Sequence, residues 1–261
     1  MTDSVLYSVA GHVATITFNR PAVMNALDAG TIRGFCAAAE RAAADTGARV
    51  VVLNGAGPAF VAGGDVAMFA KNLPAMAALV PDLADALNRG ILALRHAPKP
   101  VITSVHGAVA GAGFSIMLAC DLVLAAADTQ FSLAYARIGA SPDGGATFLL
   151  PRLAGYQRAM ELMLLADTVD AAALAQCGVI NRVLPPAELA AETAALARRL
   201  AAGPAKAYAE TKALANQALL QQLPGHLDAE AQAFARCAGS ADFAEGVTAF
   251  TMKRKPLFKG A

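Results

Sequence analysis

The chain of 261 residues is apolar and nearly neutral: 56% of its residues are hydrophobic, 16% are charged, and the formal net charge at pH 7 is +1. Such a balance offers no electrostatic footprint for nucleic acid or for a membrane surface, so neither is expected as a partner. The length suffices for one large or two modest domains with a sizeable core.

The four cysteines lie far apart and none has CxxC spacing. This argues against a metal site or a disulfide framework and fits a reducing compartment. The first residues lack a basic segment followed by an apolar core, and no uncharged apolar run reaches the roughly 20 residues of a membrane span without a Gly-rich break. We therefore expect a cytoplasmic protein without a bound metal.

The first part of the chain alternates strand and helix patterns. Gly11 separates two strands that can form a hairpin, and Asp28 is a candidate N-cap for an Ala-rich helix. The segment Asn72–Val80 is expected to be a mobile lead-in, because it contains Pro74 and precedes Pro81. The predicted elements are strands at Val5–Ala10, His12–Phe18 and Arg49–Gly55, and helices at Ala29–Ala44 and from Pro81 onward.

The stretch Pro100–Ala125 has the pattern of a buried strand, a tight turn and a buried helix. Its turn is built of small residues, and a helix that begins there presents bare N–H groups and positive dipole potential. A second small-residue turn, Ala59–Asp65, follows the strand that ends at Gly55. Two such N–H donors can form an oxyanion hole, although Gly and Ala are also what close helix–strand packing requires.

The second part of the chain becomes mainly helical. Strands are predicted at Leu122–Ala126 and near Phe131–Leu133, and Ala-rich helices begin near Tyr156, Asp170, Pro186, Pro204, Pro224 and Ala241. This order indicates an α/β core at residues 1–202 and a helical region at residues 203–261. The apolar faces of that helical region would suit a subunit interface.

Several separate motifs together resemble the crotonase (enoyl-CoA hydratase/isomerase) superfamily, in its order and along nearly the whole chain. The set is closest to the isomerase-type members with a single Asp, such as the epoxyphenylacetyl-CoA isomerases. The motifs are Phe18–Pro21 with Asn25–Leu27, Phe60–Asp65, His106–Gly113, Cys120–Asp121, Pro142–Gly145 with Leu150–Leu153, and Lys253–Gly260.

This resemblance implies a spiral of ββα units, a coenzyme A thioester as substrate and no separate cofactor, since coenzyme A belongs to the substrate. It also implies a homotrimer or a hexamer built as a dimer of trimers, with the C-terminal helices at the interface. The backbone N–H groups of Gly64 and Ala112 match the family's oxyanion hole. Expected contacts with the substrate or coenzyme A are Ala22, Val23, Ala62, Gly64, Asp65, Phe69, Ser115, Tyr135, Phe258 and Lys259.

The family's hydratases use two glutamates, and the matching positions here are Ser115 and Tyr135, which are not carboxylates. Both are expected to line the pocket rather than to transfer protons. Asp143 lies in Ser141–Gly145, which resembles the Pro-Asp-x-Gly-Gly of the isomerase-type members. One carboxylate suffices to move a proton along an allylic thioester. The alternative for Asp143 is a turn residue that bonds to local backbone.

We therefore expect Δ3,Δ2-enoyl-CoA isomerisation through Asp143, or a related isomerisation of a coenzyme A thioester. An enoyl-CoA hydratase and a non-catalytic acyl-CoA-binding homologue stay open as alternatives. Nucleophilic chemistry on an aryl thioester, as in the family's dehalogenases, is less favoured because the chain contains no Trp. His106 and Asp121 are expected to have structural roles.

Overall fold

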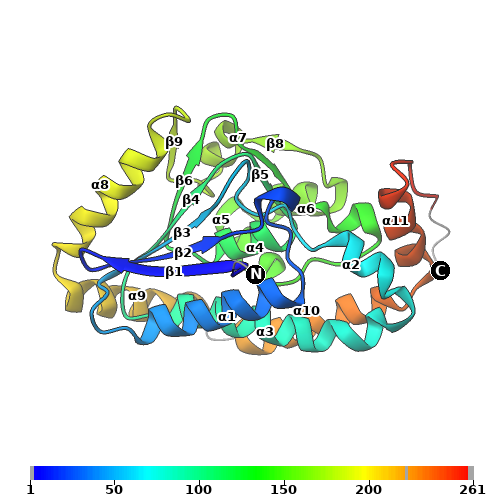
Figure 1. Cartoon of the computed structure of the whole chain (residues 1–261), viewed down its shortest axis with the longest axis horizontal. Coiled ribbons are helices and arrows are strands. Elements are labelled where there is room, and N and C mark those ends of the chain that lie inside the picture. The colour runs from blue at the N-terminus through cyan, green and yellow to red at the C-terminus, as the bar shows by residue number, and fades with distance from the viewer. Residues whose placement is uncertain (1–2, 221–222, 258–261) are drawn as a thin grey trace.

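A six-stranded sheet forms the centre of the molecule (Figure 1). In the computed structural model, which describes residues 3–220 and 223–257, the strand order is β1-β2-β3-β4-β6-β9. Only β1 and β2 pair antiparallel, as the hairpin pattern predicted; the other neighbours are parallel. The strands are β1 Val5–Ala10, β2 Val13–Phe18, β3 Val50–Gly55, β4 Val101–Val105, β6 Leu122–Ala126 and β9 Arg182–Leu184.

Helices cover both faces of this sheet. In Figure 1, α1, α3 and α10 lie along one side and α8 along the other. The side chains of β3 divide accordingly: Val51 and Leu53 join the core beneath α1, whereas Val50 and Val52 join a second cluster beneath α8. A strand buried on both faces is apolar at successive positions, which explains why residues 50–53 of β3 are all apolar.

The helical elements follow the strands in chain order. They are η1 Pro21–Val23, α1 Ala29–Ala44, α2 Val66–Lys71, η2 Leu73–Ala75, α3 Met76–His96, α4 Ala112–Leu118, η3 Ala134–Ile138, α5 Ala146–Ala154, α6 Tyr156–Leu165, α7 Ala171–Gln176, α8 Leu189–Ala201, α9 Ala205–Leu220, α10 Leu223–Ala238 and α11 Ala241–Thr251. The predicted cap of α1 is confirmed, because Asp28 accepts a 2.8 Å hydrogen bond from the Thr31 N–H.

A second, three-stranded sheet supports the central turn. It consists of β5 Ala108–Ala110, β7 Gln130–Ser132 and β8 Val169–Asp170, in the order β5-β7-β8. The sequence pattern predicts a strand, a turn and a helix here, but the turn contains the strand β5. Three residues are too few for the alternation of a strand to be recognised in the sequence. The chain after Gly155 is mainly helical, as expected, but it also contains the short strands β8 and β9, which were not predicted from the sequence.

Helix α3 begins earlier than predicted. The chain is helical from Met76, so Pro81 lies inside the helix rather than at its start. Met76 and Val80 are buried in the core, and this burial holds the turn before Pro81 in helical form despite the missing N–H. The segment expected to be a mobile lead-in is therefore mostly ordered helix.

The C-terminal helices share the core of the α/β region. Leu223, Leu227, Phe234 and Phe243 belong to the same buried cluster as the residues beneath α1. Helix α10 packs along α3 (Figure 1). Residues 203–257 thus complete the main core, apart from any role in assembly.

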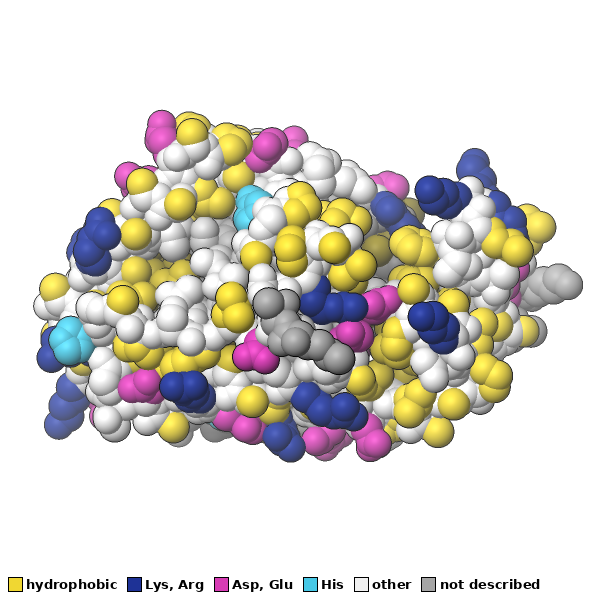
Figure 2. Space-filling view, viewed as in Figure 1, with side chains coloured by type: hydrophobic (Ala, Val, Ile, Leu, Met, Phe, Trp, Pro, Cys, Tyr) yellow, Lys and Arg dark blue, Asp and Glu magenta, His cyan; other side chains and the backbone are white. Residues whose placement is uncertain are grey.

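The surface drawn in Figure 2 mixes charge of both signs with apolar side chains. Apolar side chains gather at the end where α2, the start of α3 and α11 lie; exposed ones at this end include Leu79, Phe250 and Met252. Within residues 3–220 and 223–257, no helix combines the length and the apolar character that crossing a membrane requires.

Candidate active site

A cavity of about 130 Å³ lies where the central turns meet α2, α3 and the C-terminal helices. Most of its wall is apolar. The wall side chains include Leu27, Val66, Phe69, Leu87, Phe234 and Phe250. Backbone of Gly63, Gly64, Gly111 and Ala112 and the side chains of Tyr135, Arg137 and Asp143 supply its polar groups. Such an apolar pocket with a few convergent polar groups is the usual form of a small-molecule site.

The two small-residue turns touch each other at this cavity. A Cβ on Gly111 would lie 3.4 Å from the Gly63 Cα, and a Cβ on Gly63 would lie 3.3 Å from the Ala110 carbonyl oxygen. Both glycines have positive φ, +95° at Gly63 and +48° at Gly111. A side chain would be strained at these φ values, and at Gly63 it would also press on the Ala110 carbonyl oxygen, which explains the glycines in both turns.

The geometry leaves two N–H groups available beside the cavity. Leu27 donates to the Gly63 carbonyl (2.8 Å) and accepts from the Asp65 N–H (3.0 Å), so the N–H of Gly64 points away from that bridge. Ala112 is the first residue of α4, where an N–H has no partner within the helix. Among the described residues, neither N–H donates to a backbone carbonyl. The two positions therefore have the properties required of an oxyanion hole.

Asp143 is held at the cavity by Tyr135. The Tyr135 hydroxyl donates a 2.7 Å hydrogen bond to Asp143 Oδ1. Burial raises the pKa of Asp143 from 3.8 to about 6, with the hydrogen bond from Tyr135 opposing that rise and the charge of Glu230 adding to it. Burial also raises the pKa of Tyr135 well above 10, so Tyr135 stays a neutral donor. A carboxyl with a pKa near 6 is ionised at neutral pH and is a stronger base than an exposed aspartate.

Ser115 lies behind this pair rather than in the wall of the pocket, where the sequence had predicted it. Its side chain is fully buried in α4, and its hydroxyl donates to the Asp143 carbonyl oxygen at 2.8 Å. The Ser115 Oγ also lies 3.2 Å from the Tyr135 hydroxyl. Ser115 therefore connects α4 to the turn that carries Asp143. Of the two residues, Tyr135 is the one that lines the cavity.

Only some of the other residues predicted to contact the substrate or coenzyme A line the cavity. Ala62, Gly64, Phe69 and Tyr135 line the cavity. Ala22 and Val23 are exposed in η1 and, like Asp65, are not among the described residues that line it. Phe258 and Lys259 lie outside the described residues.

Asp65 has structural partners in this structure. Its carboxylate accepts from the Met68 N–H (3.1 Å), which caps α2, and from Arg20 at 3.2 Å. Arg20 also pairs with Asp28 at 3.1 Å. These bonds fix the loop before α1 against the turn that contains Gly64.

His106 and Asp121 both have the structural partners expected of them. His106 Nε2 contacts the Gly57 carbonyl oxygen at 2.8 Å. Asp121 accepts from the Val101 N–H (2.8 Å) and pairs with the buried Lys212 (2.7 Å).

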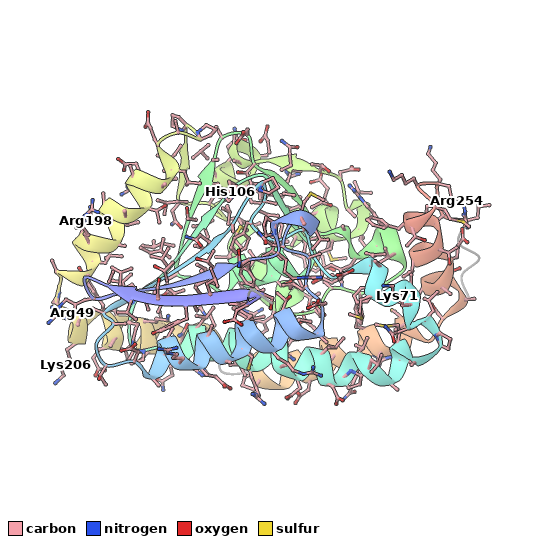
Figure 3. All side chains as sticks on the ribbon, viewed as in Figure 1. Arg49, Lys71, His106, Arg198, Lys206 and Arg254 are labelled. Atoms are coloured by element: carbon pink, nitrogen blue, oxygen red, sulfur yellow. The ribbon has the colours of Figure 1, made fainter. Side chains whose placement is uncertain are left out.

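Positive side chains lie at both ends of the molecule (Figure 3). Arg49, Arg198 and Lys206 are at one end, and Lys71 and Arg254 are at the end formed by α2 and α11. Arg254, one of the tail cations that the sequence singled out, is bound to Glu245 at 2.6 and 2.7 Å.

Three residues near the site were not predicted from the sequence. Phe234 of α10 and Phe250 of α11 complete the cavity wall. Glu230 of α10 is buried beside the turn that carries Asp143. From the sequence, their helices are predicted to belong to an oligomerisation region. The helical period of the apolar residues in α10 is the feature that indicates a buried face on that helix.

The chain resembles known proteins along nearly its whole length. The profile of the enoyl-CoA hydratase/isomerase family matches residues 9–261. The chain is 38% identical over 260 residues to a probable enoyl-CoA hydratase of Rhodobacter capsulatus, covering 98% of each chain. It is 36% identical over 265 residues to the 1,2-epoxyphenylacetyl-CoA isomerase of Escherichia coli, covering both chains fully. The crystal structure of an enoyl-CoA hydratase from Mycobacterium avium subsp. paratuberculosis superposes with a TM-score of 0.90 at 36% identity, covering 98% of each chain.

Proposed function

Because the chain belongs to the enoyl-CoA hydratase/isomerase family, we propose that it catalyses Δ3,Δ2 double-bond isomerisation of an enoyl-CoA thioester, with Asp143 as the proton-transfer residue. The observation that carries this proposal is the position of Asp143: a carboxyl with a pKa of about 6 lines an apolar cavity that Gly64 and Ala112 also line. The fold, a crotonase-like α/β spiral, is the one expected from the sequence motifs.

The proposed reaction needs one base and one site for negative charge. The Asp143 carboxylate takes a proton from the carbon next to the thioester carbonyl, and the electron pair moves into a dienolate. The same carboxyl, now protonated, returns the proton to the γ carbon, which leaves the double bond conjugated with the carbonyl. Since Tyr135 occupies Oδ1, we assign the proton transfer to Oδ2.

The dienolate oxygen is assigned to the N–H groups of Gly64 and Ala112. They are backbone groups held by the contact between the two glycine turns, so they need no reorganisation when charge develops. The dipole of α4 adds positive potential at the same point, although α4 is only seven residues long.

A hydratase is the second candidate, because relatives with that activity in their names match the chain closely. Adding water across the double bond calls for one group to activate the water and another to manage the Cα proton. Asp143 is the one carboxylate among the described residues that line the cavity. This observation favours isomerisation over hydration by two carboxylates.

The proposal is tested by supplying the purified protein with 3-enoyl-CoA and, separately, with crotonyl-CoA. We expect the absorbance of a conjugated enoyl thioester to appear with the first substrate and hydration of the second to be slow or absent. Rapid hydration of crotonyl-CoA without isomerisation of the 3-enoyl thioester would replace the proposal by the hydratase. Saturable binding of both without conversion would favour a non-catalytic acyl-CoA-binding protein.

We also propose that the protein assembles as a homotrimer or as a hexamer built from two trimers. Several apolar side chains of α6, of α11 and of the residue that follows α11 are exposed in the single chain: Leu164, Leu165, Phe250 and Met252. Covering such side chains favours association. The mass measured by light scattering tests this proposal.

A further inference from the structure

Glu230 is a buried carboxylate that no step of the proposed reaction uses. It lies on α10 with 5% of its surface exposed, and its oxygens are bound to the turn that follows Asp143. Oε2 accepts from the Gly145 N–H at 2.5 Å, and Oε1 accepts from the Thr147 N–H at 3.1 Å and from the Thr147 hydroxyl. Desolvating a carboxylate is costly, and these two backbone N–H groups and one hydroxyl compensate that cost.

These contacts complete the start of α5. The first N–H groups of a helix lack partners within it and are usually capped by a side chain just before the helix. Here the residues before α5 are Gly144 and Gly145, both with positive φ (+62° and +82°) and neither with a side chain that could cap. Glu230 supplies the cap from 85 positions away in the sequence.

The capped turn is also the turn that positions Asp143. Two consecutive glycines allow the backbone wide conformational freedom, so the direction of the Asp143 side chain depends on what holds the turn on either side. Ser115 holds the Asp143 carbonyl from α4, and Glu230 holds Gly145 from α10.

The charge of Glu230 depends on the groups around it. Burial raises the pKa of Glu230 above its ordinary 4.5, and the hydrogen bonds from Thr147 and Gly145 oppose that rise by favouring the ionised form. From η3, Tyr135 is neutral because its pKa is raised well above 10. On α10 itself, His226 Nε2 lies 3.5 Å from Glu230 Oε1 and 2.6 Å from the Thr147 hydroxyl oxygen. Burial, and secondly the charge of Arg152 on α5, lower the pKa of His226, so this imidazole is neutral at pH 7 and does not cancel the carboxylate. Arg137 of η3 also lines the cavity and keeps its positive charge there; its guanidinium donates to the Ala166 carbonyl oxygen, and Glu230 is not among its described partners.

We infer that Glu230 is a positioning residue for the proposed reaction, which holds the Asp143 turn through Gly145 and Thr147 and places a buried carboxylate beside that turn. This inference rests on the proposed function. Nearby like charge disfavours ionisation of a carboxyl, and the charge of Glu230 contributes to the raised pKa of Asp143.

Two variants separate the charge from the contact. Glu230→Gln keeps the size of the side chain and one acceptor oxygen but removes the charge. Glu230→Asp keeps the charge but withdraws the carboxylate from Gly145 and Thr147. Glu192→Gln on α8, whose partner Arg182 lies 3.6 Å away at the surface, is a matched control that removes the same charge on the other side of the sheet.

The first readout is the titration of the Asp143 carboxyl by carbon-13 NMR, with the resonance assigned from its loss in Asp143→Asn. We expect a pKa of about 6 in the wild type, the same in Glu192→Gln, and a lower value in Glu230→Gln. The acid limb of kcat/KM should move to lower pH with it, so the ratio of activity at pH 5 to activity at pH 8 rises even if both activities fall. A cap that acts only on folding predicts no such change. An Asp143 that titrates at the same pH in Glu230→Gln and the wild type would overturn the electrostatic part of the inference.

The second readout is turnover by Glu230→Asp, which also serves if Glu230→Gln does not fold. Displacing the base by a fraction of an ångström to 1 Å is expected to lower kcat about tenfold to a hundredfold with KM little changed. Full turnover by Glu230→Asp would overturn the positioning role. The NMR titration requires no substrate, so it separates this inference from the proposed function. If the wild type isomerises no enoyl thioester but the pKa of Asp143 still differs between the wild type and Glu230→Gln, the proposed function is refuted and the effect of the Glu230 charge stands.

Discussion

The Tyr135 hydroxyl donates a 2.7 Å hydrogen bond to Asp143 Oδ1, and both side chains line the same cavity. This bond favours the ionised form of Asp143, whereas burial of the carboxyl opposes it. The balance leaves a carboxylate that is ionised at neutral pH and yet basic enough to take a proton from a thioester α carbon.

Removing the Tyr135 hydroxyl should therefore raise the pKa of Asp143 further. In Tyr135→Phe the acid limb of the kcat/KM profile is expected to move above pH 6, with about a tenfold loss of activity near that pH, since a hydrogen bond to a charged group is worth on the order of 1.5 kcal/mol. Tyr7→Phe is a matched control, because the Tyr7 hydroxyl donates to Asp45 at 2.8 Å, far from the cavity. An unchanged pH profile in Tyr135→Phe would exclude this role for the hydroxyl.

The role of the Ala112 N–H can be tested by deleting it without deleting the helix. Ala112 is the first residue of α4, a position where proline is tolerated. Ala112→Pro is expected to lower kcat by about 10²- to 10³-fold through loss of one oxyanion donor. Ala112→Gly keeps the N–H and should retain most of the activity. Equal activity in the two variants would place the thioester oxygen elsewhere.

Asp143 should also make the fold less stable at neutral pH. Because its pKa is about 6 in the folded chain and 3.8 in an unperturbed aspartate, keeping it ionised above pH 6 costs the fold up to about 3 kcal/mol. The native state holds its proton more tightly than the unfolded state, so this cost disappears as the pH falls from 6 towards 4. Asp143→Asn is therefore expected to raise the free energy of unfolding at pH 7 and to lose that advantage near pH 4. Denaturant titration of both proteins at the two pH values measures the difference; an Asp143→Asn variant that is less stable at pH 7 would contradict the assigned burial.

Asp121 and Lys212 are expected to matter for stability. Lys212 is largely buried, and its ammonium group lies 2.7 Å from Asp121 and 2.7 Å from the Leu94 carbonyl oxygen. Asp121→Ala leaves that cation without its carboxylate and should lower the free energy of unfolding by about 3 kcal/mol. Urea denaturation measures this loss, and Arg182→Ala, which breaks only the exposed pair with Glu192, should change stability by about 1 kcal/mol at most. Similar losses of stability in the two variants would show that the buried Asp121–Lys212 pair contributes no more to stability than the exposed pair.

Local patterns predicted the elements of the fold that depend on neighbours in sequence. The cap of α1 by Asp28 spans three residues, and β6 at Leu122–Ala126 is a continuous apolar run; both were found where the pattern put them. Pro81 was misread as a helix start because the burial of Met76 and Val80, which makes the preceding turn helical, depends on tertiary contacts.

Site residues could be predicted from the sequence only where a recognisable motif contained them or aligned with them. The motifs brought Asp143, Tyr135 and Ser115 into one expected site, and the structure places their polar groups within hydrogen-bond distance of one another. Glu230 lies 85 positions from Gly145 and has no motif around it, so the sequence held no signal for their contact.

Exchange of substrate protons with solvent deuterium tests the central claim most directly. The wild type, incubated with an enoyl-CoA in D₂O, is expected to incorporate deuterium at the α and γ carbons, as mass spectrometry or proton NMR would detect. Asp143→Asn should bind the same thioester with similar affinity and show no exchange above the rate without protein. Exchange at the wild-type rate in Asp143→Asn would contradict the assignment of Asp143 as the proton-transfer residue.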